Sequence, residues 1–338
     1  MKIFVTGGAG YIGSHIIKNL LPKNYQTIVL DNLSTGFLEP IEILKKNFGL
    51  PAGGLEFIKG DLKDKEKLLE IFQKNKIETV IHLAAKIDVS ESVTNPDLYH
   101  RENFLNGVNL VEAMLEAGIN KMIFSSTAAV YGEPQYTPID EKHPTNPDNP
   151  YGQTKLDFER YLSKVNNLKY IILRYFNVGG ADPGGLLGKS HLKSNDLIET
   201  IMKVALDQKE SLEIYGSDYD TPDGSAIRDF VHVEDITQAH ILALKGIEEF
   251  SGEVFNLGSD LGFSAREIVD KAKKIIGKNF PVKIGRRREG DIAVSVASSK
   301  KAKRILDWKP KYSNLATIIK TDWNWRKEHP WGYKNVKT

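Results

Sequence analysis

The chain has 338 residues, 41% of them hydrophobic, and its 46 basic and 44 acidic residues leave a net charge of +2. This length predicts a large core with a smaller second lobe, and the balanced charge argues against partners such as nucleic acid or an anionic membrane. Cysteine is absent, which excludes disulfides, thiolate catalysis and Cys-type zinc sites. We expect no metal. We also expect a cytoplasmic location, because no signal-peptide layout precedes the first strand and no apolar stretch approaches the ~20 residues that span a bilayer.

The first half of the chain alternates short β-rich runs with segments of helix length. Strands are predicted over 2–6, 26–31, 55–59, 78–82, 121–125 and 169–175, and helices over 11–21, 64–74, 96–117 and 150–165. Several of the strands are almost entirely apolar, which is typical of a parallel sheet covered by helices on both faces. This order predicts an α/β fold with a doubly wound parallel (Rossmann-type) sheet, and ligands at the carboxyl ends of its strands.

The pattern changes after about residue 176. Glycine and proline mark a long loop, and the elements predicted after it are a helix over 196–208, a strand over 212–215 and helices over 234–248, 264–276 and 313–329. We expect a dinucleotide-binding domain over 1–176 and a mainly substrate-binding lobe over 177–338. We allow for strands or helices of the second lobe to return to the large domain.

A glycine-rich turn follows the first strand. Gly7, Gly10 and Gly13 have GxxGxxG spacing, which lets backbone N–H groups approach a pyrophosphate at a helix N-terminus. Asp31 ends the second strand, where a carboxylate accepts hydrogen bonds from ribose hydroxyls and repels a 2′-phosphate. The pattern therefore predicts NAD as the cofactor. Asp61, after the third strand, is either an acceptor for the adenine amino group or the N-cap of the next helix.

A tyrosine and a lysine lie four residues apart at the start of the helix predicted over 150–165. Tyr151 and Lys155 would share one face of that helix. A tyrosine base needs a pKa about three units below its usual value of ~10, and a nearby ammonium and an oxidised nicotinamide both favour the phenolate. The preceding strand ends in Ser125, Ser126 and Thr127, and Thr127 supplies a hydroxyl for the reacting group or for turn capping.

Several motifs occur together in one order: GGAGYIG at 7–13, DNL at 31–33, SSTAAVYG at 125–132, YGQTK at 151–155, RYFN at 174–177, RDFVHV at 228–233 and RREGD at 287–291. Over essentially its whole length the chain resembles the UDP-glucose 4-epimerases and the closely similar UDP-N-acetylglucosamine 4-epimerases, which are extended short-chain dehydrogenase/reductases. The glycine and Tyr/Lys motifs mark the superfamily, and the last three point to the nucleotide-sugar branch.

The resemblance implies reversible inversion at C4 of a UDP-hexose, through a 4-keto sugar and a firmly held NAD. Tyr151 would act as the base, Thr127 would bridge to the 4-hydroxyl, and Lys155 would hold the nicotinamide ribose and lower the pKa of Tyr151. The positions that match cofactor contacts are Gly7, Gly10, Tyr11, Ile12, Gly13, Asp31, Asn32, Asp61, Leu62, Leu83, Ala84, Asn103, Tyr151, Lys155 and Phe176. Those that match substrate contacts are Thr127, Tyr151, Asn177, Leu197, Tyr215, Arg228, Arg288, Asp291 and Ser295.

The small side chain of Ser295 resembles family members that also admit N-acetylated hexoses, so activity on UDP-GlcNAc and UDP-GalNAc is expected too. The resemblance further implies a homodimer in which the helices predicted over 96–117 and 150–165 pair with those of a second copy. Their apolar residues are Leu105, Val108, Leu110, Val111, Phe158 and Leu162. Packing of these residues within the chain is the alternative.

Two positions depart from the family pattern. Glu199 stands where a proline is common in the family. Some members carry a lysine at the position of Ile87, whereas here the lysine, Lys86, lies one residue earlier.

Rival functions are another nucleotide-sugar enzyme of this fold, either a dehydratase or a uronate/pentose enzyme, and a non-catalytic NAD-binding protein. The Thr127-Ala128-Ala129 segment lacks the acid pair that elimination needs, and the joint presence of Tyr151, Lys155 and Thr127 favours catalysis.

Overall fold

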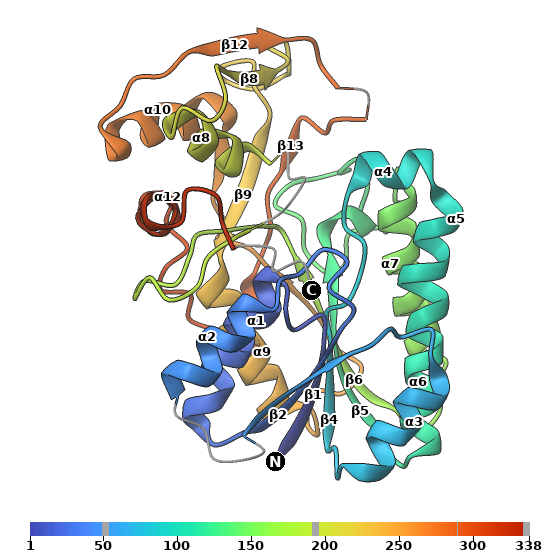
Figure 1. Cartoon of the computed structure of the whole chain (residues 1–338). Helices are drawn as coiled ribbons and strands as arrows, with labels where there is room; N and C mark the ends of the chain where they lie inside the picture. Colours follow the sequence, from blue (N-terminus) through green and yellow to red (C-terminus); the bar gives the residue numbers. More distant parts are fainter. Residues whose placement is uncertain (49–53, 191–195, 289, 334–338) are drawn as a thin grey trace.

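The structure is a computed structural model that describes residues 1–48, 54–190, 196–288 and 290–333. Within these residues the main sheet has seven strands, all parallel, in the order β10-β6-β5-β4-β1-β2-β3 (Figure 1). Their bounds are β1 (Lys2–Thr6), β2 (Gln26–Asp31), β3 (Leu55–Lys59), β4 (Thr79–His82), β5 (Lys121–Thr127), β6 (Lys169–Tyr175) and β10 (Val254–Leu257). The predicted doubly wound parallel sheet is therefore confirmed.

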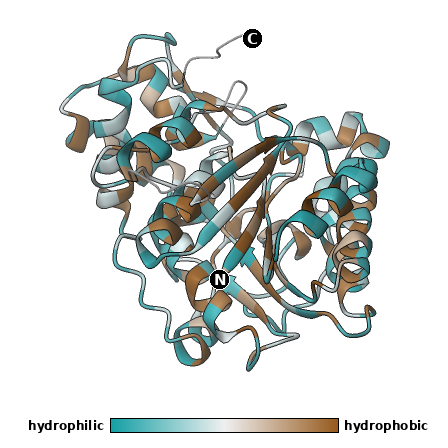
Figure 2. Ribbon diagram, turned by 60° about the horizontal axis from the view of Figure 1, so that its bottom comes forward, coloured by the Kyte–Doolittle hydropathy of each residue, from teal (hydrophilic) through white to brown (hydrophobic). Residues whose placement is uncertain are grey.

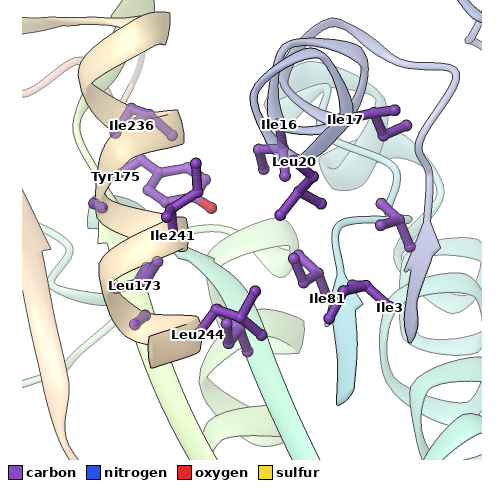
Figure 3. Close-up of a cluster of buried hydrophobic side chains, with 14 of the residues drawn as sticks. Ile3, Ile16, Ile17, Leu20, Ile81, Leu173, Tyr175, Ile236, Ile241 and Leu244 are labelled. Carbon is purple, nitrogen blue, oxygen red and sulfur yellow. The ribbon is translucent and has the colours of Figure 1, made fainter. Parts of the chain in front are cut away.

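Helices cover both faces of this sheet, which is why several of its strands are almost entirely apolar. One face carries α1 (Tyr11–Leu20), α2 (Glu39–Phe48) and α9 (Val233–Gly246), and the other carries α3 (Lys65–Lys74), α6 (Asn106–Glu116) and α7 (Pro150–Leu162) (Figure 1). Alternate residues of a strand serve different layers: Ile3 and Val5 of β1 pack in the first core, and Phe4 packs in the second. Figure 3 shows part of the first core, with Ile241 and Leu244 of α9 on one side and Ile16 and Leu20 of α1 on the other. Figure 2 shows the hydrophobic strands between helices with hydrophilic outer faces.

The second lobe lies beyond the carboxyl ends of the sheet strands (Figure 1). Its apolar core joins α8, α10 and α12 to β8 and β9. The elements are β7 (Asn177–Gly179), α8 (Leu197–Ala205), β8 (Leu212–Tyr215), β9 (Ile227–His232), β11 (Gly262–Ser264), α10 (Ala265–Ile276), β12 (Val282–Gly285), β13 (Val294–Ser295) and α12 (Leu315–Glu328). This packing places the lobe over the edge of the sheet at which ligands bind in such folds.

The predicted elements recur with small changes at their ends, but several elements were not predicted. α2, β10 and most strands of the second lobe were missed. β10 and α9, the helix predicted over 234–248, come from the second half of the chain and complete the large domain. The helix predicted over 96–117 begins as α5 (Pro96–Tyr99), passes through a π-helical stretch, η2 (His100–Leu105), and continues as α6. The remaining short helices are η1 (Leu21–Lys23), α4 (Val89–Thr94), η3 (Ala128–Val130) and α11 (Lys300–Ile305). Among the described residues, no helix combines the length and the apolar character needed to cross a bilayer.

Candidate active site

One cleft of about 1520 Å³ runs along the carboxyl ends of the sheet strands and under the second lobe. It exceeds the ~300–1,000 Å³ typical of a single-ligand site, so it has room for two ligands side by side. The predicted site residues that line it are Gly7, Gly10, Tyr11, Ile12, Gly13, Asp31, Asn32, Asp61, Leu62, Leu83, Ala84, Thr127, Tyr151, Lys155, Phe176, Asn177, Leu197, Tyr215, Arg228, Arg288 and Asp291. Asn103 and Ser295 are the two predicted residues that are not in this lining.

The glycine turn packs too tightly for side chains. Gly7 has a φ of +69°, and a Cβ there would lie 2.7 Å from the backbone nitrogen of Ala84. A Cβ on Gly13 would lie 2.5 Å from the carbonyl oxygen of Gly7. Helix α1 begins directly after this turn and, among the described residues, has neither a side-chain cap nor an acidic residue in its first turn. An uncapped N-terminus without acidic side chains is the arrangement in which helix N–H groups favour an anion.

Asp31 points a carboxylate at the same part of the cleft. Its Oδ2 accepts the N–H of Ala9 at 3.0 Å, and its Oδ1 accepts the N–H of Leu33 at 2.8 Å. Burial raises the pKa of Asp31, and these two backbone donors lower it. The bonds fix the carboxylate while leaving each oxygen a second lone pair for a ligand hydroxyl.

Asp61 is held at the cleft and does not cap a helix. Its oxygens accept the Nδ2–H of Asn32 at 3.0 Å and the N–H of Lys63 at 3.1 Å. Helix α3 begins at Lys65 and is capped by Asp64. The capping alternative for Asp61 is therefore wrong.

Asn103 lies behind the cleft wall. Its side chain is 2% exposed, and it bonds the backbone N–H and C=O of Lys86 and the Thr154 hydroxyl. It thus ties the loop after β4 to α7. Of the two neighbours in that loop, Lys86 approaches Glu91 at 3.8 Å and Ile87 is 54% exposed, and both line the cleft.

Lys155 and Tyr151 lie at the base of the cleft, on the first turns of α7. The Lys155 ammonium is buried and donates to the carbonyl oxygen of Ser125 at 2.9 Å. Burial lowers the pKa of Lys155 to about 7, and Glu159 raises it. The pKa of Tyr151 is raised by burial and lowered by hydrogen bonding to Thr127. Burial outweighs the effect of Thr127, so the pKa of Tyr151 lies above its usual value.

Two arginines face the other end of the cleft. The Arg288 guanidinium lies 3.7 Å from the ring centre of Tyr215, and Arg228 approaches Asp291 at 3.5 Å. The neighbouring Arg287 is bound to Asp218 and lies over the Tyr219 ring. Of these two arginines in the RREGD motif, Arg288 is therefore the one that lines the cleft. Glu289 of the same motif lies outside the described residues.

The remaining predicted substrate positions surround this end. Asn177 lines the cleft and donates to the backbone carbonyl of Asp229 at 2.9 Å, and Leu197 begins α8. Ser295, in β13, pairs with Arg228 of β9 in a parallel register. Directly paired residues of a sheet point to the same face, so Ser295 shares the side of Arg228.

Some cleft residues were not predicted as site residues. Ser125, Ser126 and Tyr175 lie at the ends of β5 and β6, within motifs that the sequence singled out for other positions. Lys189 also lines the cleft, but it stands in a loop without a local pattern. Its position could not have been predicted because it depends on how that loop folds back.

A parallel sheet with a glycine turn, an acidic β2 end and a Tyr–Lys pair beside one cleft defines an extended short-chain dehydrogenase/reductase. The chain belongs to the NAD dependent epimerase/dehydratase family, whose model matches residues 3–258.

Three relatives are similar to the chain over nearly its full length. A UDP-glucose 4-epimerase of Halalkalibacterium halodurans is 45% identical over 98% of both chains. The UDP-glucose 4-epimerase of Bifidobacterium longum, solved with NAD⁺ and UDP, is 35% identical with a TM-score of 0.93, covering 98% of this chain and all of the other. The UDP-Glc/GlcNAc 4-epimerase of Campylobacter jejuni is 41% identical with a TM-score of 0.84, covering 97% and 99%.

Proposed function

We propose that this protein is an NAD-dependent UDP-hexose 4-epimerase. The observation that carries the proposal is one cleft with a glycine turn at one end, two arginines and Tyr215 at the other, and Tyr151 between them. A dinucleotide and a nucleotide sugar bound from the two ends would meet at that tyrosine. Residues 1–176 would form the NAD-binding domain with the returning β10 and α9, and residues 177–338 would mainly bind the substrate.

The cofactor end suits NAD. A pyrophosphate fits where Gly7 and Gly13 exclude side chains and where α1 presents free N–H groups. Asp31 would accept the adenosine ribose hydroxyls, and its charge disfavours the 2′-phosphate of NADP. Asp61, with Asn32, would receive the adenine amino group. When bound, NAD supplies a hydride acceptor and donor for C4 of the sugar, together with a positive charge near Tyr151.

Tyr151 would remove the proton from the sugar 4-hydroxyl and return it once the 4-keto sugar has turned its other face. Thr127, whose hydroxyl lowers the pKa of Tyr151, would bridge to that hydroxyl and keep it within reach. Lys155 would hold the nicotinamide ribose. Because burial raises the pKa of Tyr151, the base becomes effective only when positive charge is brought into the site.

The substrate end suits a UDP-sugar. Arg228 and Arg288 would bind the diphosphate, and Tyr215 would cover the uracil ring. Arg288 now lies over Tyr215, so it would exchange this ring contact for the phosphate. The neighbour from Bifidobacterium longum was solved with UDP, which supports this assignment. The small Ser295 supports activity on N-acetylated hexoses as well, as in the Campylobacter jejuni relative.

We further propose a cytoplasmic homodimer. Of the apolar residues expected at its interface, Leu110, Val111, Phe158 and Leu162 are buried in the core of the chain itself. Leu105 is 45% exposed and Val108 is half-buried. The proposed contact therefore rests on η2 and the start of α6.

The deciding experiment incubates the protein with UDP-glucose, UDP-galactose, UDP-GlcNAc and UDP-GalNAc and follows C4 inversion by NMR, with bound NAD measured after denaturation. We expect inversion of the plain hexoses and tightly held NAD. Release of water from the sugar would indicate a dehydratase instead. Bound NAD without turnover of any of the four would overturn the proposal in favour of a non-catalytic protein.

A further inference from the structure

Three residues one turn apart on α7 face the end of β5. Tyr151, Lys155 and Glu159 have i, i+4, i+8 spacing and therefore share one side of the helix. They face three consecutive β5 residues. Thr127 lowers the pKa of Tyr151, Lys155 donates to the Ser125 carbonyl, and Glu159 accepts from the Ser126 hydroxyl. Tyr151 and Lys155 have roles in the proposed function, whereas Glu159 has none in it.

Glu159 is a buried carboxylate, 5% exposed, at the centre of a dense set of hydrogen bonds. Its Oε1 accepts the Ser126 hydroxyl at 2.5 Å and the Nε–H of Arg174 at 3.0 Å, and its Oε2 accepts from Nη2 of Arg174 at 2.5 Å. Such a two-pronged pair has a fixed geometry. Together with the Ser126 bond, this ion pair fixes the position of α7 along β5 and β6.

Arg174 has anchors of its own. Its Nη1 donates to the Tyr131 hydroxyl at 2.9 Å, which in turn donates to Asn256 of β10 at 2.7 Å. The guanidinium thus stays fixed to β10 and to the Tyr131 ring, 4.9 Å away. Glu159 is the link between this fixed group and the helix that carries Tyr151.

The charge of Glu159 also acts on Lys155. The titratable group of β4 that faces Lys155 is His82, which burial keeps neutral by lowering its pKa to about 3. On β6, Arg174 is paired with Glu159. The β5 residues that contact Lys155 are uncharged. On α7, Tyr151 is neutral because burial raises its pKa. Among the described residues, Glu159 is the charged group that raises the pKa of Lys155.

We propose that Glu159 is a positioning residue of this site. It holds the Tyr151–Lys155 side of α7 in register with the end of β5 and offsets the charge of the buried Lys155 ammonium. The inference rests on the proposed function for its effect on turnover, but its effect on Lys155 does not depend on it.

The test measures the titration of Lys155 directly, by NMR of protein labelled with ¹³Cε-lysine and assigned with Lys155→Met. In Glu159→Gln we expect the titration midpoint to move to lower pH by about one unit or more, because an opposite charge is lost. The alkaline limb of kcat should move in the same direction. kcat should also fall about 10- to 100-fold, with little change in the KM of the UDP-sugar, because the reacting groups are misplaced.

Matched variants separate this role from a purely structural one. Glu159→Gln leaves Arg174 buried without its partner, so the double variant with Arg174→Met removes both charges and keeps the packing. Its Lys155 midpoint should stay below that of wild type. Glu159→Asp should restore the midpoint in part. Glu234→Gln, which removes a carboxylate from the distant Lys18 pair, should leave it unchanged.

A Lys155 midpoint in Glu159→Gln equal to that of wild type would overturn the proposal. So would a double variant that regains both the wild-type midpoint and the wild-type kcat. If wild-type protein inverts no UDP-sugar, the proposed function fails, and the NMR titration still decides whether Glu159 acts on Lys155.

Discussion

Tyr151 is the residue on which the proposed chemistry depends most directly. Tyr151→Phe keeps the ring and its packing and removes the hydroxyl that exchanges the proton. We expect turnover to fall by at least the ~10²–10⁴-fold typical of general acid–base groups, with fold and bound NAD retained. Tyr136→Phe, at an exposed tyrosine bonded to Asp140, is the control for loss of a phenol. Near-normal turnover in Tyr151→Phe would remove Tyr151 from the role of base.

Ser295 is the residue proposed to leave room for the N-acetyl group. Because it shares the face of Arg228, a tyrosine in its place would add bulk on the substrate side, where only one class of substrate needs space. Ser295→Tyr should lose UDP-GlcNAc and UDP-GalNAc turnover and keep UDP-galactose turnover, measured as kcat/KM for each sugar. Ser295→Ala, which stays small, should keep both. Equal losses on all substrates in Ser295→Tyr would exclude a selective gate.

Asp322 of α12 is a buried carboxyl whose charge is costly. Burial raises its pKa to about 6, with Arg326 and Lys189 opposing the shift. Between its unfolded value, near 3.8, and about 6 the folded protein binds more protons than the unfolded chain, so stability falls as pH rises through this window.

Asp322→Asn removes that cost. In urea unfolding it should raise the free energy of unfolding at pH 8, by up to about 3 kcal/mol, and the gain should shrink as pH falls from 6 to 4. Asp270→Asn, at an exposed position of α10, is the control and should show no such trend. A gain for Asp322→Asn that does not change with pH would contradict the assignment.

At the scale of elements, loss of a helix cap should have different effects on α7, which carries Tyr151, and on α3, which only covers the sheet. Asn149 caps α7 by accepting the N–H of Gly152 at 2.9 Å, and Asp64 caps α3 by accepting the N–H of Lys67 at 3.0 Å. Replacing either by alanine should cost about 0.5–2 kcal/mol of stability. Asn149→Ala should also lower kcat, because Tyr151 lies in the first turn of α7.

Comparing the two alanine variants separates an effect on catalysis from a loss of stability. Thermal unfolding should show similar losses for Asn149→Ala and Asp64→Ala, while only the first changes kcat at saturating substrate. If both variants lowered kcat equally, global destabilisation would account for the effect and the order of α7 would not.

At the scale of the whole molecule, the proposed homodimer can be tested at an exposed residue of η2. Leu105 of η2 is an exposed apolar residue on the side proposed to form the dimer. Leu105→Glu would place a charge in that contact, where desolvation opposes burial. We expect wild type to sediment as a dimer at micromolar concentration and Leu105→Glu to shift towards monomer. Leu261→Glu, at a comparably exposed leucine in the second lobe, should stay dimeric. A wild-type protein that sediments as a monomer throughout would refute the dimer.

The sequence by itself determined those features that depend on near neighbours in the chain. The glycine turn, Asp31 at the end of β2 and the Tyr151–Lys155 pair all follow from short spacings, because backbone sterics and helical periodicity act over a few residues. The same is true of the apolar strands and hence of the parallel sheet. These features were enough to predict the superfamily, and all of the predicted site residues except Asn103 and Ser295 line the cleft.

The tertiary structure decided everything that depends on which distant segments meet. It brought β10 beside β6, about 80 residues earlier in the chain, bound Asn103 to the backbone of Lys86, and bound Arg287 to Asp218 so that Arg288 faces the cleft. It also placed Lys155 on a carbonyl oxygen and Glu159 between α7 and Arg174. Long-range pairing and burial select these contacts, and both depend on the whole packed core, so no local pattern in the sequence specifies them.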